Sequence, residues 1–190
     1  MICVGTPSKK NGDLSLDYIE SVCREIGFVR REKADWHAVV VRSTVLPGTV
    51  KNVVSPILED CSGKKAGVDF GVAVNPEFLR EGKAVGDTLH PDRIVLGGVS
   101  ERSEAVMRAV YAAPIAEGSP VVVTDLPTAE LVKVSANAFL ATKISFINEI
   151  ANVCELTGAD VTEVARGMGL DRRIGPSFLR AGVGFGGSCF

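Results

Sequence analysis

The sequence predicts an α/β protein in which a doubly wound, mostly parallel sheet is followed by one long helix and a smaller helical region. Two observations support this fold class. Five short runs of mostly β-branched residues alternate with amphipathic segments over residues 1–125, which is the spacing of βα units. Residues 127–157 then contain no glycine, and no proline after Pro127, so they predict a helix about 45 Å long at ~1.5 Å per residue. The change in character predicts two domains, 1–125 and 126–190.

Each expected element has its own signal. The strands are continuous apolar runs, typical of parallel strands covered on both faces. They occupy the first residues of the chain and residues 37–43, 69–75, 93–98 and 119–125. Segments with the helical apolar period, or with charges that suit the helix dipole, are residues 15–32, 49–59, 100–112 and 160–168. At the start of the long helix, Asp125 and Thr128 offer a capping residue, Pro127 suits the first turn and Glu130 is an early acid.

Composition argues against several classes of function. A net charge of −2 gives no reason to expect nucleic acid or a membrane surface as a partner, and no apolar run approaches the ~18 residues that span a bilayer. Five cysteines without a CxxC pair argue against a disulfide framework or a zinc site. They favour a reducing compartment, with the cytoplasm as the default. Only His37 and His90 are available for histidine chemistry.

Lys133 and Asn137 interrupt the apolar surface of the long helix. They are four residues apart, so they share one face of a helix. A lysine on a buried helix needs a polar partner, because an unpaired buried charge is costly or loses its proton. An internal salt bridge, or a lysine that reaches solvent, explains this pattern as well as a catalytic role does.

Three predicted strands end in turns with small or polar residues: 5–7 (Gly-Thr-Pro), 42–44 (Arg-Ser-Thr) and 75–77 (Asn-Pro-Glu). Ligands of open α/β sheets collect at the carboxyl ends of the strands. The turns therefore predict a cofactor edge, although each alone is also common in ordinary loops.

Glu77 and Glu81 are spaced to share one face of a helix that would follow Pro76. Such a pair of carboxylates suits proton transfer or the positioning of a water molecule beside a cofactor. The simpler interpretation is a solvated helix face on which Arg80 and Lys83 are the partners.

The last residues are rich in glycine and lead to a cysteine. Residues 182–187 formally match G-x-G-x-x-G, but no predicted strand precedes them and no helix follows, so we do not interpret them as a dinucleotide-binding turn. The glycines indicate backbone that passes close to a ligand. Cys189 is then either a nucleophile, activated by a nearby lysine or helix N-terminus, or a small buried hydrophobic residue.

Taken together, the motifs VGTP, RSTVLPGT, NPEFLREG, ELVKVSANAFLATKISFINEI and RIGPSFLRAGVGFGGSCF resemble the successive motifs of the nucleotide-sugar 6-dehydrogenases. The resemblance covers essentially the whole chain. It implies the remainder of a Rossmann-like NAD-binding domain at 1–125 and a central helical dimerisation domain at 126–190. Family members also have an earlier βαβ unit with the G-x-G-x-x-G turn and a further domain after the cysteine motif. We therefore expect this sequence to be an internal part of such an enzyme, lacking both ends.

The resemblance also implies a mechanism, in which NAD oxidises the C6 alcohol of a nucleotide sugar twice and Cys189 forms a thioester that water hydrolyses to a uronic acid. Lys133 and Asn137 would manage the oxyanion and its proton, and Glu77 and Thr44 would place the water. The residues implied to line NAD are Val4, Gly5, Thr6, Pro7, Ser8, Ser43, Thr44, Val45 and Glu81. Those implied to contact the substrate are Glu77, Phe78, Leu79, Arg80, Glu81, Lys133, Asn137, Arg173, Arg180, Gly182, Gly184, Phe185 and Gly186. Arg173 would reach a neighbouring subunit, so a homodimer through the long helix is implied.

The resemblance is divided between two branches of the family. The part up to residue 72 is more similar to enzymes of GDP-mannose, and the part from residue 75 to enzymes of UDP-glucose. Because the substrate-facing motifs lie in the second part, UDP-glucose is favoured and GDP-mannose is the alternative. The β-hydroxyacid dehydrogenases also place a lysine and an asparagine four residues apart on a long helix, but they need no cysteine. A truncated remnant that dimerises without binding NAD is the non-catalytic alternative.

Overall fold

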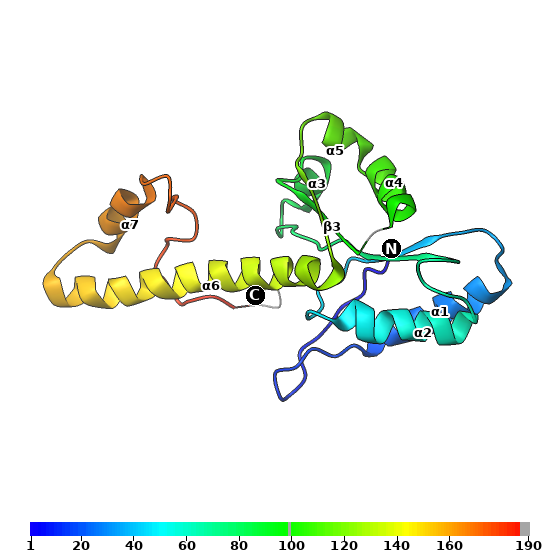
Figure 1. The fold of residues 1–190 in the computed structure, drawn as a ribbon. Coiled ribbons are helices and arrows are strands. Elements are labelled where there is room, and N and C mark those ends of the chain that lie inside the picture. The colour runs from blue at the N-terminus through cyan, green and yellow to red at the C-terminus, as the bar shows by residue number, and fades with distance from the viewer. Residues whose placement is uncertain (99, 187–190) are drawn as a thin grey trace. The chain divides into compact units, whose positions relative to one another are not determined.

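The computed structural model describes residues 1–98 and 100–186, and Figure 1 shows the fold. The predicted fold class is confirmed, because a mainly parallel α/β sheet precedes one long helix. The chain forms two compact units, Met1–Val134 and Ser135–Phe190. The division into domains 1–125 and 126–190 stays a prediction.

The sheet of the first unit has four strands in the order β1-β2-β3-β4. They are β1 (Ala38–Val41), β2 (Gly71–Val74), β3 (Ile94–Gly97) and β4 (Val121–Thr124). β1 pairs with β2 in parallel, as β3 does with β4, whereas β2 and β3 are antiparallel with Val74 opposite Gly97. The strand predicted at the N-terminus is wrong in extent, since it is reduced to one parallel bridge from Ile2 to Val41.

Two of the helices predicted in the first unit are divided in the structure. They are α1 (Asp17–Glu32), the π-helix η1 (Val50–Val54), α2 (Ser55–Ser62), α3 (Ala84–Leu89), α4 (Glu101–Val110) and α5 (Ala112–Ala116). The helix predicted at 49–59 begins as the π-helix and continues as α2. The helix predicted at 100–112 is interrupted at Tyr111, which separates α4 from α5.

Alternate residues of the strands face two separate clusters of buried side chains. Val39 and Val41 of β1 belong to the same cluster as Leu58 of α2. Val40, between them, belongs to a second cluster with Met107 of α4. This is the two-residue period of a strand that is covered on both faces. In Figure 1, α1 and α2 accordingly lie on one side of the sheet and α4 and α5 on the other.

The expectation that Glu77 and Glu81 share the face of a helix is wrong. Residues 75–80 have no regular secondary structure, and α3 begins only at Ala84. The carboxylate of Glu77 accepts the N–H of Leu79, a local bond that competes with helix formation. Gly82 adopts a left-handed φ of 74°, which ends any regular structure that would have continued from Pro76.

The predicted long helix is confirmed as α6 (Leu126–Thr157), which has 32 residues. It begins in the first unit and continues in the second. Its start is capped by Asp125, one of the two residues expected to offer a cap, whose carboxylate accepts the N–H of Thr128 at 2.8 Å. Gly158 follows its last residue with a φ of 75°, a conformation that commonly ends helices.

The second unit also contains α7 (Val161–Gly169), capped by the side chain of Asp160. Hydrogen bonds join the segment after α7 to α6. Lys143 donates from Nζ to the carbonyl of Ile174 at 3.0 Å, and the N–H of Gly182 donates to Oδ1 of Asn148 at 2.9 Å. Over residues 1–98 and 100–186, no helix has the length and apolar character needed to cross a membrane.

Candidate active site

The turn after Ile2 and the turn after β1 are bonded to each other. The hydroxyl of Ser43 accepts the N–H of Val4 at 2.9 Å and donates to the Val4 carbonyl at 2.6 Å. The hydroxyl of Thr6 donates to the carbonyl of Thr44 at 2.9 Å. The structure thus brings together the two segments that hold most of the residues predicted to line NAD.

Lys133 reaches the end of β2 from α6. The residue is only 8% exposed, and its Nζ lies 3.9 Å from Oε2 of Glu77 and 5.4 Å from the ring centre of Phe78. Lys133 also lines a small hollow in the surface of the first unit. The residues around this hollow are Ser43, Thr44, Val45, Val74, Pro76, Glu130 and Lys133. Three of the five predicted catalytic residues, Lys133, Glu77 and Thr44, therefore lie at one place in the first unit.

Glu130 also lines this hollow and was not predicted. It is 1% exposed, and its carboxylate accepts the N–H of Gly48 at 2.6 Å and the N–H of Val50 at 2.8 Å. Burial raises the pKa of Glu130, and the two backbone hydrogen bonds oppose that rise. The signal in the sequence was a second charged residue three positions before Lys133, on a helix that is otherwise apolar there.

The predicted substrate residues that follow Glu77 lie in three different settings. Phe78 stacks against Arg93, whose guanidinium carbon is 3.8 Å from the ring centre. Arg80 is bonded to Asp87 of α3 through both its backbone N–H and its guanidinium group. Hydrogen bonds from Arg80 lower the pKa of Asp87 to about 2. Glu81 lies exposed in the turn before α3.

A buried polar network that was not predicted holds the end of β2. Asn75 is 2% exposed, and its Oδ1 accepts hydrogen bonds from Arg42 at 2.7 Å and from the Tyr111 hydroxyl at 2.5 Å. Its Nδ2 donates to the carbonyl of Val95 at 2.8 Å. These bonds fix the backbone immediately before the segment that carries Glu77.

The predicted site residues of the second unit are described in that unit by themselves. Asn137 lies on α6 one turn after Lys133, as the sequence predicted. Arg173 is bonded to Asp171, with its Nη2 2.6 Å from Oδ2. Five further residues are exposed: Arg180, Gly182, Gly184, Phe185 and Gly186. Cys189 lies outside the described residues, so its proximity to Lys133 stays a prediction.

A sheet edge made of Gly-Thr-Pro and Ser-Thr turns, with a buried lysine beside a glutamate, fits the dehydrogenases that bind a dinucleotide at strand ends. Residues 1–115 match the NAD binding domain of the UDP-glucose/GDP-mannose dehydrogenase family, and residues 127–190 match its central domain. The class is that of the NAD-dependent nucleotide-sugar dehydrogenases. The chain belongs to the UDP-glucose/GDP-mannose dehydrogenase family, and the match to its NAD binding domain confirms the predicted cofactor.

Curated relatives carry both names that the resemblance implied. The chain is 56% identical over 191 residues to a GDP-mannose 6-dehydrogenase of Pseudomonas savastanoi pv. phaseolicola, covering 100% of this chain and 43% of that protein. It is 48% identical over 189 residues to a UDP-glucose 6-dehydrogenase of Rickettsia bellii, covering 100% of this chain and 42% of that protein. The chain thus spans less than half the length of these relatives.

Solved structures give the same result. A GDP-mannose dehydrogenase of Pseudomonas aeruginosa, solved as a ternary complex, matches with a TM-score of 0.86 and 50% identity over 98% of this chain and 43% of that one. A UDP-glucose dehydrogenase of Pyrobaculum islandicum matches with a TM-score of 0.91 and 46% identity over 98% of this chain and 42% of that one. The similarity in fold therefore extends over nearly the whole chain.

Proposed function

We propose that the full-length protein carrying this chain oxidises the C6 alcohol of UDP-glucose twice, with NAD, to give UDP-glucuronate. The observation that carries this proposal is the buried Lys133, whose Nζ lies 3.9 Å from the Glu77 carboxylate at the ends of β1 and β2. An ammonium group held away from water stabilises a developing oxyanion more strongly than one in solvent. The oxygen of the sugar that loses its hydrogen develops such a charge.

The open space around the Gly-Thr-Pro turn fits a dinucleotide. A Cβ built at Gly5 would meet no atom within 4 Å, so a bulky group can approach this backbone. The turn is held by the hydroxyls of Ser43 and Thr6, which keeps the surface fixed before the cofactor binds. In this proposal Val4 to Ser8, Ser43 to Val45 and Glu81 contact NAD, which accepts the hydride in each oxidation.

The residues of the chain then have distinct roles. Lys133 holds the C6 oxygen and relays its proton as the alcohol becomes an aldehyde. Cys189, as the thiolate, adds to the aldehyde carbon to form a thiohemiacetal, and loss of a second hydride gives a thioester. Glu77 and Thr44 position the water that hydrolyses the thioester to the carboxylate and the free thiol. Asn137, one turn from Lys133, holds the same oxygen or an ordered water.

The choice of nucleotide sugar rests on the position of the motifs. The substrate-facing segments, residues 75–81 and 171–190, resemble the UDP-glucose branch, so UDP-glucose is the proposed substrate. GDP-mannose is the second candidate, because the identity to a GDP-mannose 6-dehydrogenase, 56%, exceeds the 48% to a UDP-glucose 6-dehydrogenase. Identity over the whole chain includes many residues that never face a substrate, and we therefore weigh it less.

We also propose that the protein forms a homodimer through α6. Phe139, Phe146 and Val153 repeat every seven residues along this helix and are 65%, 46% and 48% exposed. Seven residues are about two helical turns, so these side chains form one apolar stripe of the kind that pairs helices. In this proposal the partner's copy of the stripe covers it, and Arg173 reaches the neighbouring site.

The test is to incubate the full-length protein with NAD and either UDP-glucose or GDP-mannose, and to compare NADH formed with uronic acid released. We expect two molecules of NADH per uronic acid and a higher kcat/KM with UDP-glucose. Cys189→Ser should stop uronic acid release while sugar nucleotide still binds, and Cys61→Ser should behave as the wild type. Uronic acid release by the Cys189→Ser variant at the wild-type rate would exclude the nucleophile role.

The non-catalytic alternative makes a different prediction for binding. A remnant that dimerises without binding NAD would show the same thermal midpoint with and without the cofactor. An NAD-binding protein must instead become more stable, because the ligand binds only the folded state. A thermal midpoint that does not change at millimolar NAD would favour the remnant.

A further inference from the structure

We propose that Glu130 is a positioning residue that holds the turn carrying Thr44 in place against the helix carrying Lys133. This inference rests on the proposed function, because it assumes that Thr44 and Lys133 act on the same substrate. Glu130 would act on the reaction through this turn, and it would not exchange protons with the substrate itself.

The carboxylate of Glu130 is held at both oxygens. Oε2 accepts the N–H of Gly48 at 2.6 Å, and Oε1 accepts the N–H of Val50 at 2.8 Å. The residue is 1% exposed, so water does not compete for these bonds in the folded protein. An ionised carboxylate is the side chain best suited to accept from two backbone donors at once.

The two donors follow Thr44 by four and six residues, where the segment after β1 leads into η1. Gly48 has a φ of 92°, and Val50 begins the π-helix η1. The N–H groups at the start of a helix have no partner within the helix, and Glu130 supplies one from α6, 80 residues further along the chain.

The other end of this segment is bound to a different part of the unit. Ser43 exchanges two hydrogen bonds with the backbone of Val4, and Thr6 donates to the carbonyl of Thr44. Thr44 is therefore placed between an anchor on the NAD-binding turn and the anchor that Glu130 provides. Only the second anchor comes from α6, where Glu130 precedes Lys133 by three residues. Glu130 is thus the direct link between the two predicted catalytic groups.

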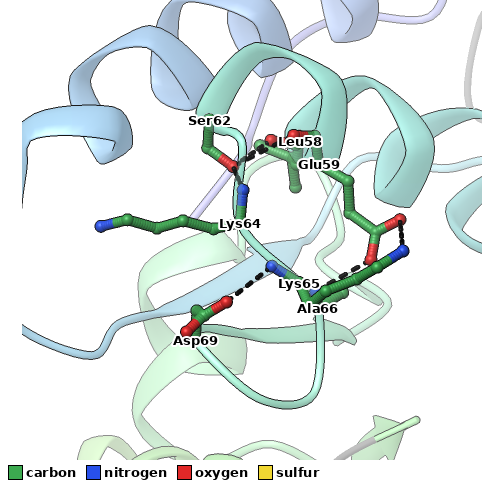
Figure 2. Close-up of polar contacts among 7 residues, drawn as sticks. All are labelled: Leu58, Glu59, Ser62, Lys64, Lys65, Ala66 and Asp69. Carbon is green, nitrogen blue, oxygen red and sulfur yellow. Dashed lines mark hydrogen bonds and ion pairs between the residues drawn. The ribbon is translucent and has the colours of Figure 1, made fainter.

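A purely structural cap is the competing explanation, and the chain offers a matched control for it. Glu59 of α2 also accepts a backbone N–H from a turn, that of Ala66 at 3.0 Å, and it pairs with Lys65 at 3.7 Å, as Figure 2 shows. Glu59 is not among the residues that line the hollow with Lys133. Glu59→Gln therefore weakens a comparable turn without touching the link between Thr44 and Lys133.

The experiment compares Glu130→Gln, Glu130→Asp and Glu59→Gln in the full-length enzyme by steady-state kinetics and thermal unfolding. A glutamine has one acceptor oxygen in place of two, so one of the two N–H groups loses its partner. A misplacement of about 1 Å costs up to ~100-fold in rate, so we expect kcat of Glu130→Gln to fall roughly 10- to 100-fold. The KM for the nucleotide sugar should change by less than about threefold, since no group that binds it is removed.

Glu130→Asp keeps the charge but is shorter by one methylene group, and it should recover part of kcat. It also serves as the test if Glu130→Gln does not fold. Amide hydrogen exchange at Gly48 and Val50 should become faster in both variants, which reports the broken anchor without any assay of activity. Glu59→Gln should lower the thermal midpoint while kcat stays at the wild-type value.

Three results would overturn the inference. One is a wild-type kcat in folded Glu130→Gln or Glu130→Asp, and another is an equal loss of kcat in Glu59→Gln. The third is unchanged hydrogen exchange at Gly48. A wild-type protein that forms no NADH with either nucleotide sugar would instead refute the proposed function, and this inference with it.

Discussion

The two compact units differ in how they bury apolar residues. The first has two clusters of buried side chains, one on each face of its sheet. Among the described residues of the second unit, only Ile147, Cys154 and Leu179 are buried apolar side chains. Many large apolar residues of that unit are exposed instead, among them Phe139, Phe146, Val153, Leu156 and Leu170. The first unit therefore holds most of the buried apolar side chains among the described residues. The proposed dimer would cover exposed apolar side chains of the second unit.

The largest expected effect is the loss of activity on removal of the buried cation of the first unit. Lys133→Met keeps the length of the side chain but removes the charge beside Glu77, and we expect kcat to fall roughly 10²- to 10⁴-fold. Lys51→Met, which changes an exposed lysine of η1, is the control. Rapid-quench measurement of the first hydride transfer would locate the defect. A kcat of Lys133→Met within twofold of the wild-type value would mean that the reaction does not depend on Lys133.

The next effect tests the exposed stripe of the second unit. Phe146→Asp places a charge in the proposed helix pairing, and loss of a central aromatic contact costs about 2 kcal/mol or more. The dimer dissociation constant should rise by about thirtyfold or more, as measured by sedimentation equilibrium. Ser145→Asp, an adjacent exposed residue, is the matched control. If both variants associate as the wild type does, the stripe is covered by something other than a second copy.

A third prediction tests whether the first unit is packed independently. A Cβ on Gly97 would lie 2.4 Å from Cβ of Ala129 and 2.6 Å from Cγ1 of Val74, so Gly97→Ala forces side chains and backbone apart. We expect a loss of about 1–3 kcal/mol in the free energy of unfolding, with no change in the dimer dissociation constant. Gly86→Ala is the control, because its Cβ would meet nothing within 4 Å. Denaturant titration measures both variants.

The smallest effect is a pH dependence in the first unit. Hydrogen bonds from Arg80 lower the pKa of Asp87 from 3.8 to about 2 in the folded state. The unfolded state therefore binds more protons between these values, so the stabilisation is complete above pH 3.8 and is lost as the pH falls through 2. Asp87→Asn should reduce the dependence of the urea midpoint on pH over this range. Equal slopes in wild type and Asp87→Asn would contradict the assignment.

The parts of the fold that depend on local sequence were predicted best. The period and length of the apolar pattern were enough to predict α6 and the positions of β1 to β4, because these elements depend on residues that are close together in the sequence. The helix expected after Pro76 is absent, because the Leu79 N–H donates to the Glu77 carboxylate, a local bond that competes with the helix that the charge spacing suggested. The role of Glu130 was not predictable in the same way. Its hydrogen-bond donors, Gly48 and Val50, lie about 80 residues earlier, and no local pattern in the sequence predicts this pairing.

For the candidate site, residue type was enough to predict which side chains take part, but their hydrogen-bond partners depend on the fold. The Ser-Thr and Gly-Thr-Pro turns were recognisable as strand ends, but the bonds between Ser43 and Val4 follow from the pairing of Ile2 with β1. Asn75 illustrates the limit. An asparagine at the end of an apolar strand indicates that a polar contact is needed there. That Arg42 and Tyr111 donate to it is visible only in the fold.

Because β3 runs antiparallel to β2, the start of β3 lies near the carboxyl ends of β1 and β2. Arg93, the residue just before β3, is therefore the arginine found there. Val74 of β2 is opposite Gly97 of β3, and continuing that antiparallel register by four residues sets Phe78 opposite Arg93, the pair whose ring and guanidinium are 3.8 Å apart. If β3 were parallel to β2, Arg93 would instead lie near the amino-terminal ends of β1 and β2. The antiparallel pairing of β2 with β3 thus places an arginine from the start of one strand beside the carboxyl end of another.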